Sequence, residues 1–443
     1  MKKMMILLTI LLTGVVSKVN AQGIQFWKGS IEEAMQEAKK QNKLVFIDFY
    51  TVWCGPCKSL AQTVFTREDV GTYFNKTFIC CQLDAEKEGK AMAQKYGVNS
   101  YPTLLFINGN GDLIVRASGA LPAEDLIKRG EEAVTSVDDP NNVSNLKKRY
   151  AAGERGEQFL KFYIAKMKEN DMDPGNATEE YLKVQKSMEE SSSKMMEFFM
   201  EYPDAFTVGG EAERIFKENE KEYMAIATDM EENKLKQIYA RMMRRTQGLA
   251  LKNKDVAMYE LFIDRWLKLP EKPHYQDYND LRLDLMLMRG ETKAYQKEAM
   301  HYLDSIVDSR SVEQIKEEDE ERYQEYCKTH PAIGFIQIAM RDSYKNLDAK
   351  LQVRAIQKVG SQLIKNGLKK KDFKRYPKWI EHGKQLMPDN VEMLNFEANV
   401  LYRQGKRDEA IELKRKVVDM VKNNAKAYPT LKAQLDKMEA GTF

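Results

Sequence analysis

Two cysteines three positions apart, Cys54 and Cys57, are the residues of this chain best suited to covalent chemistry. Two thiols at this spacing can close a disulfide when the start of a helix brings their Cα atoms within about 7 Å. The thiolate is the nucleophile of disulfide exchange, and unpaired N–H groups at a helix N-terminus stabilise it. We therefore expect dithiol–disulfide exchange, with Cys54 as the exposed attacking thiol and Cys57 as the partly buried resolving thiol.

The residues around the pair predict an apolar strand that runs into a helix. Residues 44–50 are rich in β-branched and aromatic side chains, which is typical of a buried strand. Pro56 fits the first turn of a helix, where its missing N–H costs nothing. One acid, Asp48, interrupts the apolar run. A buried carboxyl there is expected to have a raised pKa and to exchange the proton of Cys57 through a water molecule.

A zinc knuckle is the main alternative for a Cys-x-x-Cys pair. Such a site needs four ligands. The chain has no second Cys-x-x-Cys pair, and its histidines lie far away in sequence, at His274, His301, His330 and His382. We therefore predict no metal site, and the only redox group expected is the Cys54–Cys57 disulfide itself.

The segment from Trp53 to Lys58 resembles the signature of the thioredoxin family. An acid stands six residues before the first cysteine, as in that family, and Val98–Thr103 is similar to its loop with a cis-proline. Gly119 stands where the family usually has a glycine after its last strand. The resemblance implies catalysis by Cys54, Cys57 and Asp48. It also implies that an extended substrate segment pairs with the main chain at a lip formed by Trp53, Gly55, Pro56, Tyr101 and Pro102.

Hydrophobic periodicity predicts the other elements of an α/β thioredoxin fold. A short first strand is expected to close at 27–29, and Ser30–Glu33 is a capping box that opens a helix. The remaining expected elements are a helical turn from 66, a strand at 77–84, a helix at 87–96, a hairpin of strands 103–107 and 113–118, and a helix from 122 to about 134.

The N-terminus has the pattern of a secretion signal. Lys2-Lys3 precedes an apolar run from Met4 to Val16, and Val19–Ala21 supplies a small-residue cleavage site. The run is short for a membrane span, and an uncleaved membrane anchor is the alternative. We therefore expect a periplasmic or secreted protein. Exported compartments are oxidising, so the dithiol there is either kept reduced by a dedicated donor or works as an oxidant or isomerase.

Three short segments, 50–53, 63–65 and 69–70, look closest to the exported branch of the thioredoxin family. That branch includes the C-terminal domain of the DsbD-type disulfide interchange proteins. The resemblance covers roughly residues 26–134. It implies protein disulfides as substrates and a membrane electron donor of the DsbD type as a partner.

Three further cysteines lie outside the motif. Cys80 and Cys81 are adjacent in the second long predicted strand and should point to opposite faces, which favours two inert thiols over a vicinal disulfide or redox pair. Cys80 also stands where many thioredoxins carry a lysine near the buried acid. Asp48 is therefore expected to lack that partner and to have a further raised pKa. Cys327, in a charged helix, is expected to be a lone half-buried thiol.

The 443 residues are too many for one ordinary domain, and the balance of 70 basic and 67 acidic residues gives no reason to expect a nucleic-acid partner. Residues 135–145 are polar turn formers and predict a linker. The expected organisation is a signal peptide at 1–21, a thioredoxin-like domain at 22–134, the linker at 135–145 and an all-α domain at 146–443.

The all-α part contains a segment that resembles a tetratricopeptide repeat. In residues 396–411 a helix stops at Gly405 and the next begins with Ala410 packed against it, and turn formers bracket a unit of about 34 residues. Weaker copies are expected at 140–174 and 278–306. Such repeats would bind an unidentified protein or peptide, and an irregular helical bundle is the alternative.

Together these patterns predict an exported thiol–disulfide oxidoreductase that reduces protein disulfides. Two other functions stay open. The helical repeats can be a protein-binding scaffold for which the thioredoxin-like domain is a docking unit, or the protein can be a disulfide isomerase. The sequence names neither the substrate nor the partner of the helices.

Overall fold

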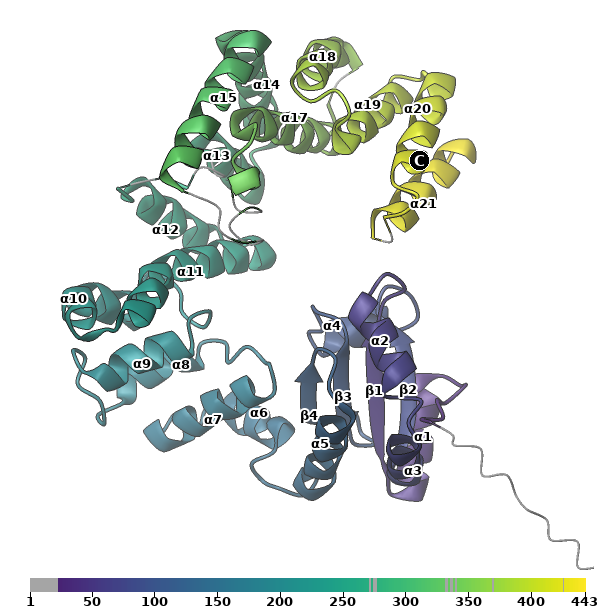
Figure 1. Cartoon of the computed structure of the whole chain (residues 1–443), viewed down its shortest axis with the longest axis vertical. Coiled ribbons are helices and arrows are strands. Elements are labelled where there is room, and N and C mark those ends of the chain that lie inside the picture. Colours follow the sequence, from purple (N-terminus) through teal and green to yellow (C-terminus); the bar gives the residue numbers. More distant parts are fainter. Residues whose placement is uncertain are drawn as a thin grey trace, which may run out of the picture. The chain divides into compact units, whose positions relative to one another are not determined.

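The computed structural model describes residues 23–443, except 271, 274–276, 331–333, 335–337, 339–340, 369 and 425 and the side chains of 370–371. The predicted signal peptide and His274 lie outside the described residues. The chain divides into two compact units, the first ending at Lys186 and the second running from Ser187 to Phe443 (Figure 1).

The first unit mixes helices and strands. Its elements are α1 (Ile31–Gln41), β1 (Leu44–Tyr50), α2 (Gly55–Thr63), α3 (Glu68–Thr77), β2 (Phe78–Asp84), α4 (Lys90–Lys95), β3 (Thr103–Ile107), β4 (Leu113–Ser118), α5 (Ala123–Ser136), α6 (Val143–Ala151), α7 (Glu157–Glu169) and α8 (Ala177–Val184). The capping box predicted at Ser30–Glu33 is present at the start of α1. The predicted strands and the hairpin are present within a few residues of their expected bounds.

The four strands form one sheet in the order β2-β1-β3-β4. The strand β1 runs parallel to β2 and antiparallel to β3, which pairs antiparallel with β4. The short first strand that was predicted to end at 27–29 is reduced to a single bridge between Phe26 and Cys80. The residues just before the bridge bond elsewhere: Ile24 donates its N–H to the Phe65 carbonyl and Gln25 donates to Asn75 Oδ1.

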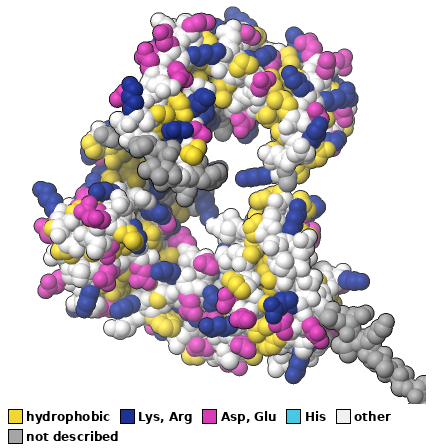
Figure 2. Space-filling view, viewed as in Figure 1, with side chains coloured by type: hydrophobic (Ala, Val, Ile, Leu, Met, Phe, Trp, Pro, Cys, Tyr) yellow, Lys and Arg dark blue, Asp and Glu magenta, His cyan; other side chains and the backbone are white. Residues whose placement is uncertain are grey.

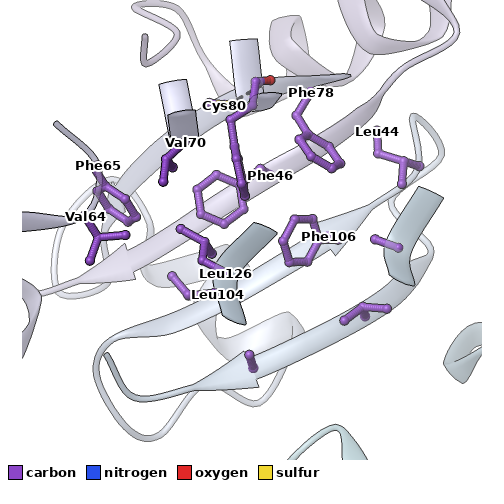
Figure 3. Packing of buried hydrophobic residues seen from close by; sticks show 14 of the residues in the cluster. Leu44, Phe46, Val64, Phe65, Val70, Phe78, Cys80, Leu104, Phe106 and Leu126 are labelled. Carbon is purple, nitrogen blue, oxygen red and sulfur yellow. Dashed lines mark hydrogen bonds between the residues drawn. The ribbon is translucent and has the colours of Figure 1, made fainter. Parts of the chain in front are cut away.

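One face of the sheet carries an aromatic core (Figure 3). Phe46 lies at its centre and contacts Phe74 of α3 and Phe106 of β3, with ring centroids 4.9 and 5.2 Å apart. Leu60 of α2 and Leu126 of α5 close the same cluster. This packing fixes α2, the helix that follows the cysteine motif, on the sheet.

The opposite face is covered by α1, which packs on β1 and β2, and by the C-terminal end of α4. Arg116 of β4 is 3% exposed and donates from its guanidinium to the carbonyl of Tyr96, 3.0 Å away. A cation is favourable at this end of a helix, because the last carbonyls carry partial negative charge.

The first unit extends beyond the predicted domain boundary at residue 134. The strand β4 lies at the edge of the sheet, and the turn after α7 covers part of that edge. Asn170 accepts the backbone N–H of Arg116 through its side-chain oxygen at 2.9 Å, and Asp171 accepts that of Ser118 at 3.1 Å. An open edge invites pairing with other chains, so α6 and α7 complete this unit, and the residues 135–145 predicted as a linker lie inside it.

Helices are the only secondary-structure elements among the described residues of the second unit (Figure 1). Its elements are α9 (Ser193–Glu201), α10 (Glu211–Ile226), α11 (Asp229–Asn253), α12 (Val256–Leu267), α13 (Tyr278–Met288), α14 (Thr292–Ser309), α15 (Val312–Thr329), α17 (Leu347–Lys365), the 3-10 helix η1 (Lys370–Arg375), α18 (Tyr376–Leu386), α19 (Val391–Arg403), α20 (Arg407–Met420) and α21 (Ala427–Glu439). None of the described helices of the chain combines the length and the apolar composition needed to cross a bilayer.

The segment predicted as a tetratricopeptide-like unit forms the helix pair α19 and α20. Gly405 joins them with φ at +89°, a conformation that glycine adopts without a steric penalty. Ala410 is fully buried, and α19 packs on α20 as expected. The pairs α6–α7 and α13–α14 coincide with the two weaker copies. The structure thus confirms helix pairs at these places, while their identity as repeats stays a prediction.

Candidate functional site

The cysteine motif lies where β1 passes into α2. Cys54 is the N-cap residue of α2 and Gly55 and Pro56 open its first turn, as the sequence predicts. A disulfide joins Cys54 to Cys57, with their Cα atoms 5.3 Å apart. Cys54 Sγ also accepts the backbone N–H of Cys57 at 3.1 Å. A thiolate at Cys54 would keep this N–H donor and gain the helix dipole, which lowers the pKa of a thiol.

We expected Cys54 to be exposed, and this prediction is wrong for the form in which Cys54 is bonded to Cys57. Cys54 is 3% exposed and Cys57 is 4% exposed. The reason lies in the cap: the sulfur that accepts the helix N–H is turned inward onto the first turn of α2. The neighbouring Val52, by contrast, is 43% exposed. The rim of the site therefore offers side chains to a partner, while the sulfurs lie just below it.

Trp53 and Tyr101 form one side of that rim. Their rings meet edge to face with centroids 5.8 Å apart, and the Tyr101–Pro102 peptide bond is cis, as the family resemblance implies. The ring contact brings the loop at 98–103 beside the cysteine motif. A third member, Glu86, has no recognisable signal in the sequence. It accepts the indole N–H of Trp53 at 3.0 Å and so orients the ring.

Asp48 is a buried carboxyl below this rim, on the sheet face that α2 covers. It is 1% exposed, and burial raises the pKa of Asp48 to about 6. One of its oxygens, Oδ2, accepts a hydrogen bond from the Gln82 amide at 2.9 Å. The other, Oδ1, is buried and has no hydrogen-bond partner among the described residues. The carboxyl is thus held at one oxygen and left available for a proton at the other.

Gln82 is the site residue that sequence reasoning missed. The expected absence of a lysine at position 80 does not leave Asp48 without any polar partner, because the parallel register places Gln82 of β2 directly opposite it. The hydrogen bond from Gln82 lowers the pKa of Asp48 and opposes part of the effect of burial. An exact register between β1 and β2 would have revealed this pair, but hydrophobic pattern alone does not fix it.

Cys80 and Cys81 are buried free thiols. Cys80 lies opposite Phe46 in the aromatic core, and its thiol approaches the Phe74 carbonyl at 3.8 Å. Burial raises the pKa of both thiols, that of Cys81 to about 12. Neither is suited to nucleophilic exchange, which agrees with the prediction of inert thiols. Cys327 is half-buried and free, as expected.

Known proteins share this arrangement of residues. The family described as "Thioredoxin-like domain" matches residues 31–133. Thioredoxin 2 of Chlorobaculum tepidum is 30% identical over 110 residues, which are 25% of this chain and 96% of that protein. The chain belongs to the thioredoxin family. Thioredoxin-1 of Schizosaccharomyces pombe is 38% identical over 84 residues, or 19% of this chain and 76% of that protein.

One solved structure is also similar to part of this chain in sequence. It belongs to a protein from Bacteroides thetaiotaomicron that is provisionally called a disulphide-isomerase. It is 45% identical and covers 26% of this chain and 96% of its own, with a TM-score of 0.25. These relatives match only about the first quarter of this thioredoxin-family chain, and the helical second unit lies outside the 31–133 match. Membership in the family implies thiol–disulfide chemistry on protein disulfides for the first unit.

The described residues also bear on metal binding. They contain no group of three or more His, Cys, Asp or Glu side chains placed to hold a metal ion. Cys54 and Cys57 are bonded to each other.

Proposed function

We propose that the protein is an exported thiol–disulfide oxidoreductase that reduces disulfides in other proteins. The observation that carries the proposal is the Cys54–Cys57 disulfide at the N-terminus of α2, beside the Trp53–Tyr101 rim. In the reduced enzyme, the Cys54 thiolate attacks one sulfur of a substrate disulfide and forms a mixed disulfide. The other substrate sulfur leaves as a thiolate.

Cys57 resolves the mixed disulfide. Its thiol loses a proton to Asp48 through a water molecule, and the resulting thiolate attacks Cys54 Sγ. The bond between Cys54 and the substrate breaks, and the second substrate sulfur leaves as a thiolate that takes up a proton. The products are a substrate with two thiols and the enzyme disulfide seen here. A carboxyl with a pKa of about 6 is suited to this exchange near neutral pH, because its ionised and protonated forms are both accessible. The cycle then needs two electrons from a donor, for which we propose a membrane protein of the DsbD type.

The reducing direction rests on the Gly55-Pro56 pair, which resembles that of reducing thioredoxins. Reducing and strongly oxidising members of the family differ by about 150 mV, or roughly 7 kcal/mol for two electrons. The reduction potential of the full chain, measured against a glutathione or dithiothreitol buffer, should lie near −270 mV, the value of thioredoxin itself. A potential near −120 mV would identify an oxidant and overturn this direction.

Turnover tests the activity itself. The full chain with dithiothreitol should accelerate the reduction of insulin disulfides, and Cys54→Ser should abolish the acceleration. The Cys80→Ser variant is the matched control, because it also replaces one thiol by a hydroxyl in the same unit. Equal rates with the wild type and with Cys54→Ser would rule out the proposed enzyme.

The helical unit has a second candidate role, as a platform that binds protein partners. The helix pair α19–α20 with its glycine turn supports this role, since stacked helix pairs of this kind present extended binding surfaces. Size-exclusion mass measurement separates it from the isomerase alternative, which requires the helices to dimerise the chain.

A further inference from the structure

Helix α11 has an unusual distribution of charge. From Asn233 to its last residue, Asn253, it carries six Lys and Arg residues and no Asp or Glu, although basic and acidic residues are nearly balanced in the whole chain. The visible surface of the molecule otherwise mixes the two signs at close range (Figure 2). A run of one sign on a packed helix creates a local positive potential, which attracts anionic partners.

The second half of α11 holds several of these cations around one cleft. Its volume is about 360 Å³, and its lining includes Asp204, Arg241, Arg244, Arg245, Gly248 and Lys252. The cations recur at helical spacing, so they project from one side of α11, while the other side is buried through Ile238, Met242 and Ala250. The helix backbone therefore fixes the positions from which these charges extend.

The charges of the cleft are only partly neutralised. Arg241 donates to both carboxylate oxygens of Asp204, at 2.8 and 2.7 Å. Arg244 and Lys252 are exposed and form no ion pair with any side chain that the structure describes. Asp204 is the only acid in the lining. The cleft therefore keeps an excess of positive charge, which an anionic ligand can neutralise.

Gly248 forms the floor between these cations. It is exposed, and a Cβ added there would meet no atom within 4 Å. Glycine inside a helix costs about 0.5–1 kcal/mol relative to alanine, and no packing contact requires it here. Its lack of a side chain leaves room for another chain to approach the helix backbone between Arg244 and Lys252.

We infer that this cleft on α11 binds an acidic segment of a protein partner. Arg guanidinium groups pair with carboxylates in a two-pronged geometry, and a cleft of this size admits one or two Glu or Asp side chains. The choice of a polypeptide over other anions rests on the proposed function, because the substrates of a disulfide reductase are proteins. The cleft would bind the acidic segment of a substrate or of a redox partner. This contact is separate from the disulfide that the partner exchanges with the cysteine motif.

A direct binding experiment tests this inference. The full chain with Cys54→Ser/Cys57→Ser is titrated into a fluorescent short polyglutamate peptide, with polyglutamine as the neutral probe, at low and at high salt. We expect binding to polyglutamate alone, which weakens as salt screens the charges. Because this variant lacks both thiols, the result does not depend on whether the enzyme reduces disulfides.

Two changes locate the binding. Arg244→Glu/Lys252→Glu should weaken the affinity for polyglutamate by about tenfold or more. Lys293→Glu/Lys297→Glu on α14 alters the net charge equally at exposed positions and should change the affinity less than about twofold. Gly248→Leu fills the floor without altering charge. It should also weaken binding although leucine is a better helix former than glycine.

Three results would overturn the inference. The first is no binding of polyglutamate at low salt. The second is an equal loss of affinity with the α14 control. The third is binding of phosphatidylserine vesicles through Arg244 and Lys252 without binding of polyglutamate, which would assign the cleft to a membrane surface instead. Circular dichroism of each variant confirms that α11 is intact.

Discussion

Asp48 in the first unit and Lys414 in the second are both buried ionisable side chains, and their surroundings differ. Lys414 of α20 is fully buried, and its ammonium donates to the side-chain oxygens of Asn395, Asn399 and Gln434. An ammonium has three protons, so each one has an acceptor. Asp48 has one hydrogen bond, from Gln82, and its Oδ1 has no partner in the described part of the chain.

This difference separates a fully paired buried group from a partly paired one. A fully paired buried group holds its neighbours in one arrangement and has no atom left for a reaction. A buried polar atom without a partner is costly in free energy, so its presence beside a disulfide calls for an explanation. Lys414 therefore joins α19, α20 and α21, whereas Asp48 keeps one carboxylate oxygen without a partner among the described residues, as the proton exchange that we propose for it requires.

The largest expected effect is on catalysis and follows from Asp48→Asn. The amide keeps the shape of the carboxyl but cannot accept the proton of Cys57. Insulin reduction should slow by about 10²-fold, the lower end of what general acid–base catalysis supplies. The same assay on Lys414→Met should give the wild-type rate. A slowed Lys414→Met enzyme would break the distinction between the two groups.

Removing Lys414 should act on stability instead. Lys414→Met leaves three half-buried amide oxygens without their donor, at a cost of about 1 kcal/mol for each. We expect the free energy of unfolding, measured with urea, to fall by about 3 kcal/mol. Asp48→Asn should leave this free energy unchanged or raise it near neutral pH, because it removes a buried charge.

The pH dependence of stability should have opposite signs for the two groups. Burial raises the pKa of Asp48 to about 6, so the folded chain holds that proton more tightly than the unfolded chain, and stability is lost as pH rises from about 4 to about 6. Burial lowers the pKa of Lys414 to about 8, so stability is lost as pH falls from about 10.5 to about 8.

For each of the two groups, the pH-dependent change in the free energy of unfolding amounts to about 3 kcal/mol at most. Urea unfolding across pH 4–10.5, with Asp48→Asn and Lys414→Met as references, isolates them from the other titrating groups. A flat difference between the wild type and Asp48→Asn over pH 4–6 would contradict the assignment of a buried, protonatable carboxyl at this site.

Substitutions of Gln82 should have the smallest effect, a shift in the pH dependence of turnover. They test whether the hydrogen bond from Gln82 sets the pKa of Asp48. Gln82→Leu removes the donor from Oδ2, so the pH midpoint of turnover that Asp48 controls should move up. Gln82→Lys replaces it by a positive donor and should move the midpoint down. Rates at the pH optimum should change only a few-fold. Midpoints that do not move in either variant would show that Gln82 has a structural role alone.

Much of the site could be predicted from sequence because its parts are local. The strand-to-helix pattern around Cys54 and the position of Asp48 in a buried strand are readable from periodicity and residue type. The loop before Pro102 was recognised by its resemblance to a family. Its place beside Trp53 became visible only through the contact between the two rings.

The residues that escaped prediction depend on contacts between distant segments. Gln82 reaches Asp48 only through strand register, and Asn170 reaches β4 only through a turn 54 residues after Arg116. Lys414, in an amphipathic helix, has the pattern of a surface lysine, yet the helices on either side bury it. The burial of Cys54 accompanies its contacts with Cys57, the disulfide and the hydrogen bond from the Cys57 N–H, which spacing alone does not reveal.

Trapping of the mixed disulfide tests the central claim most directly. In Cys57→Ser the resolving thiol is absent, so a substrate protein that contains a disulfide should remain covalently attached to Cys54. Mass spectrometry of the non-reduced complex should find this single linkage and find none with Cys54→Ser/Cys57→Ser. If the two variants capture the same amount of substrate protein, or none, Cys54 is not the nucleophile and the account is wrong.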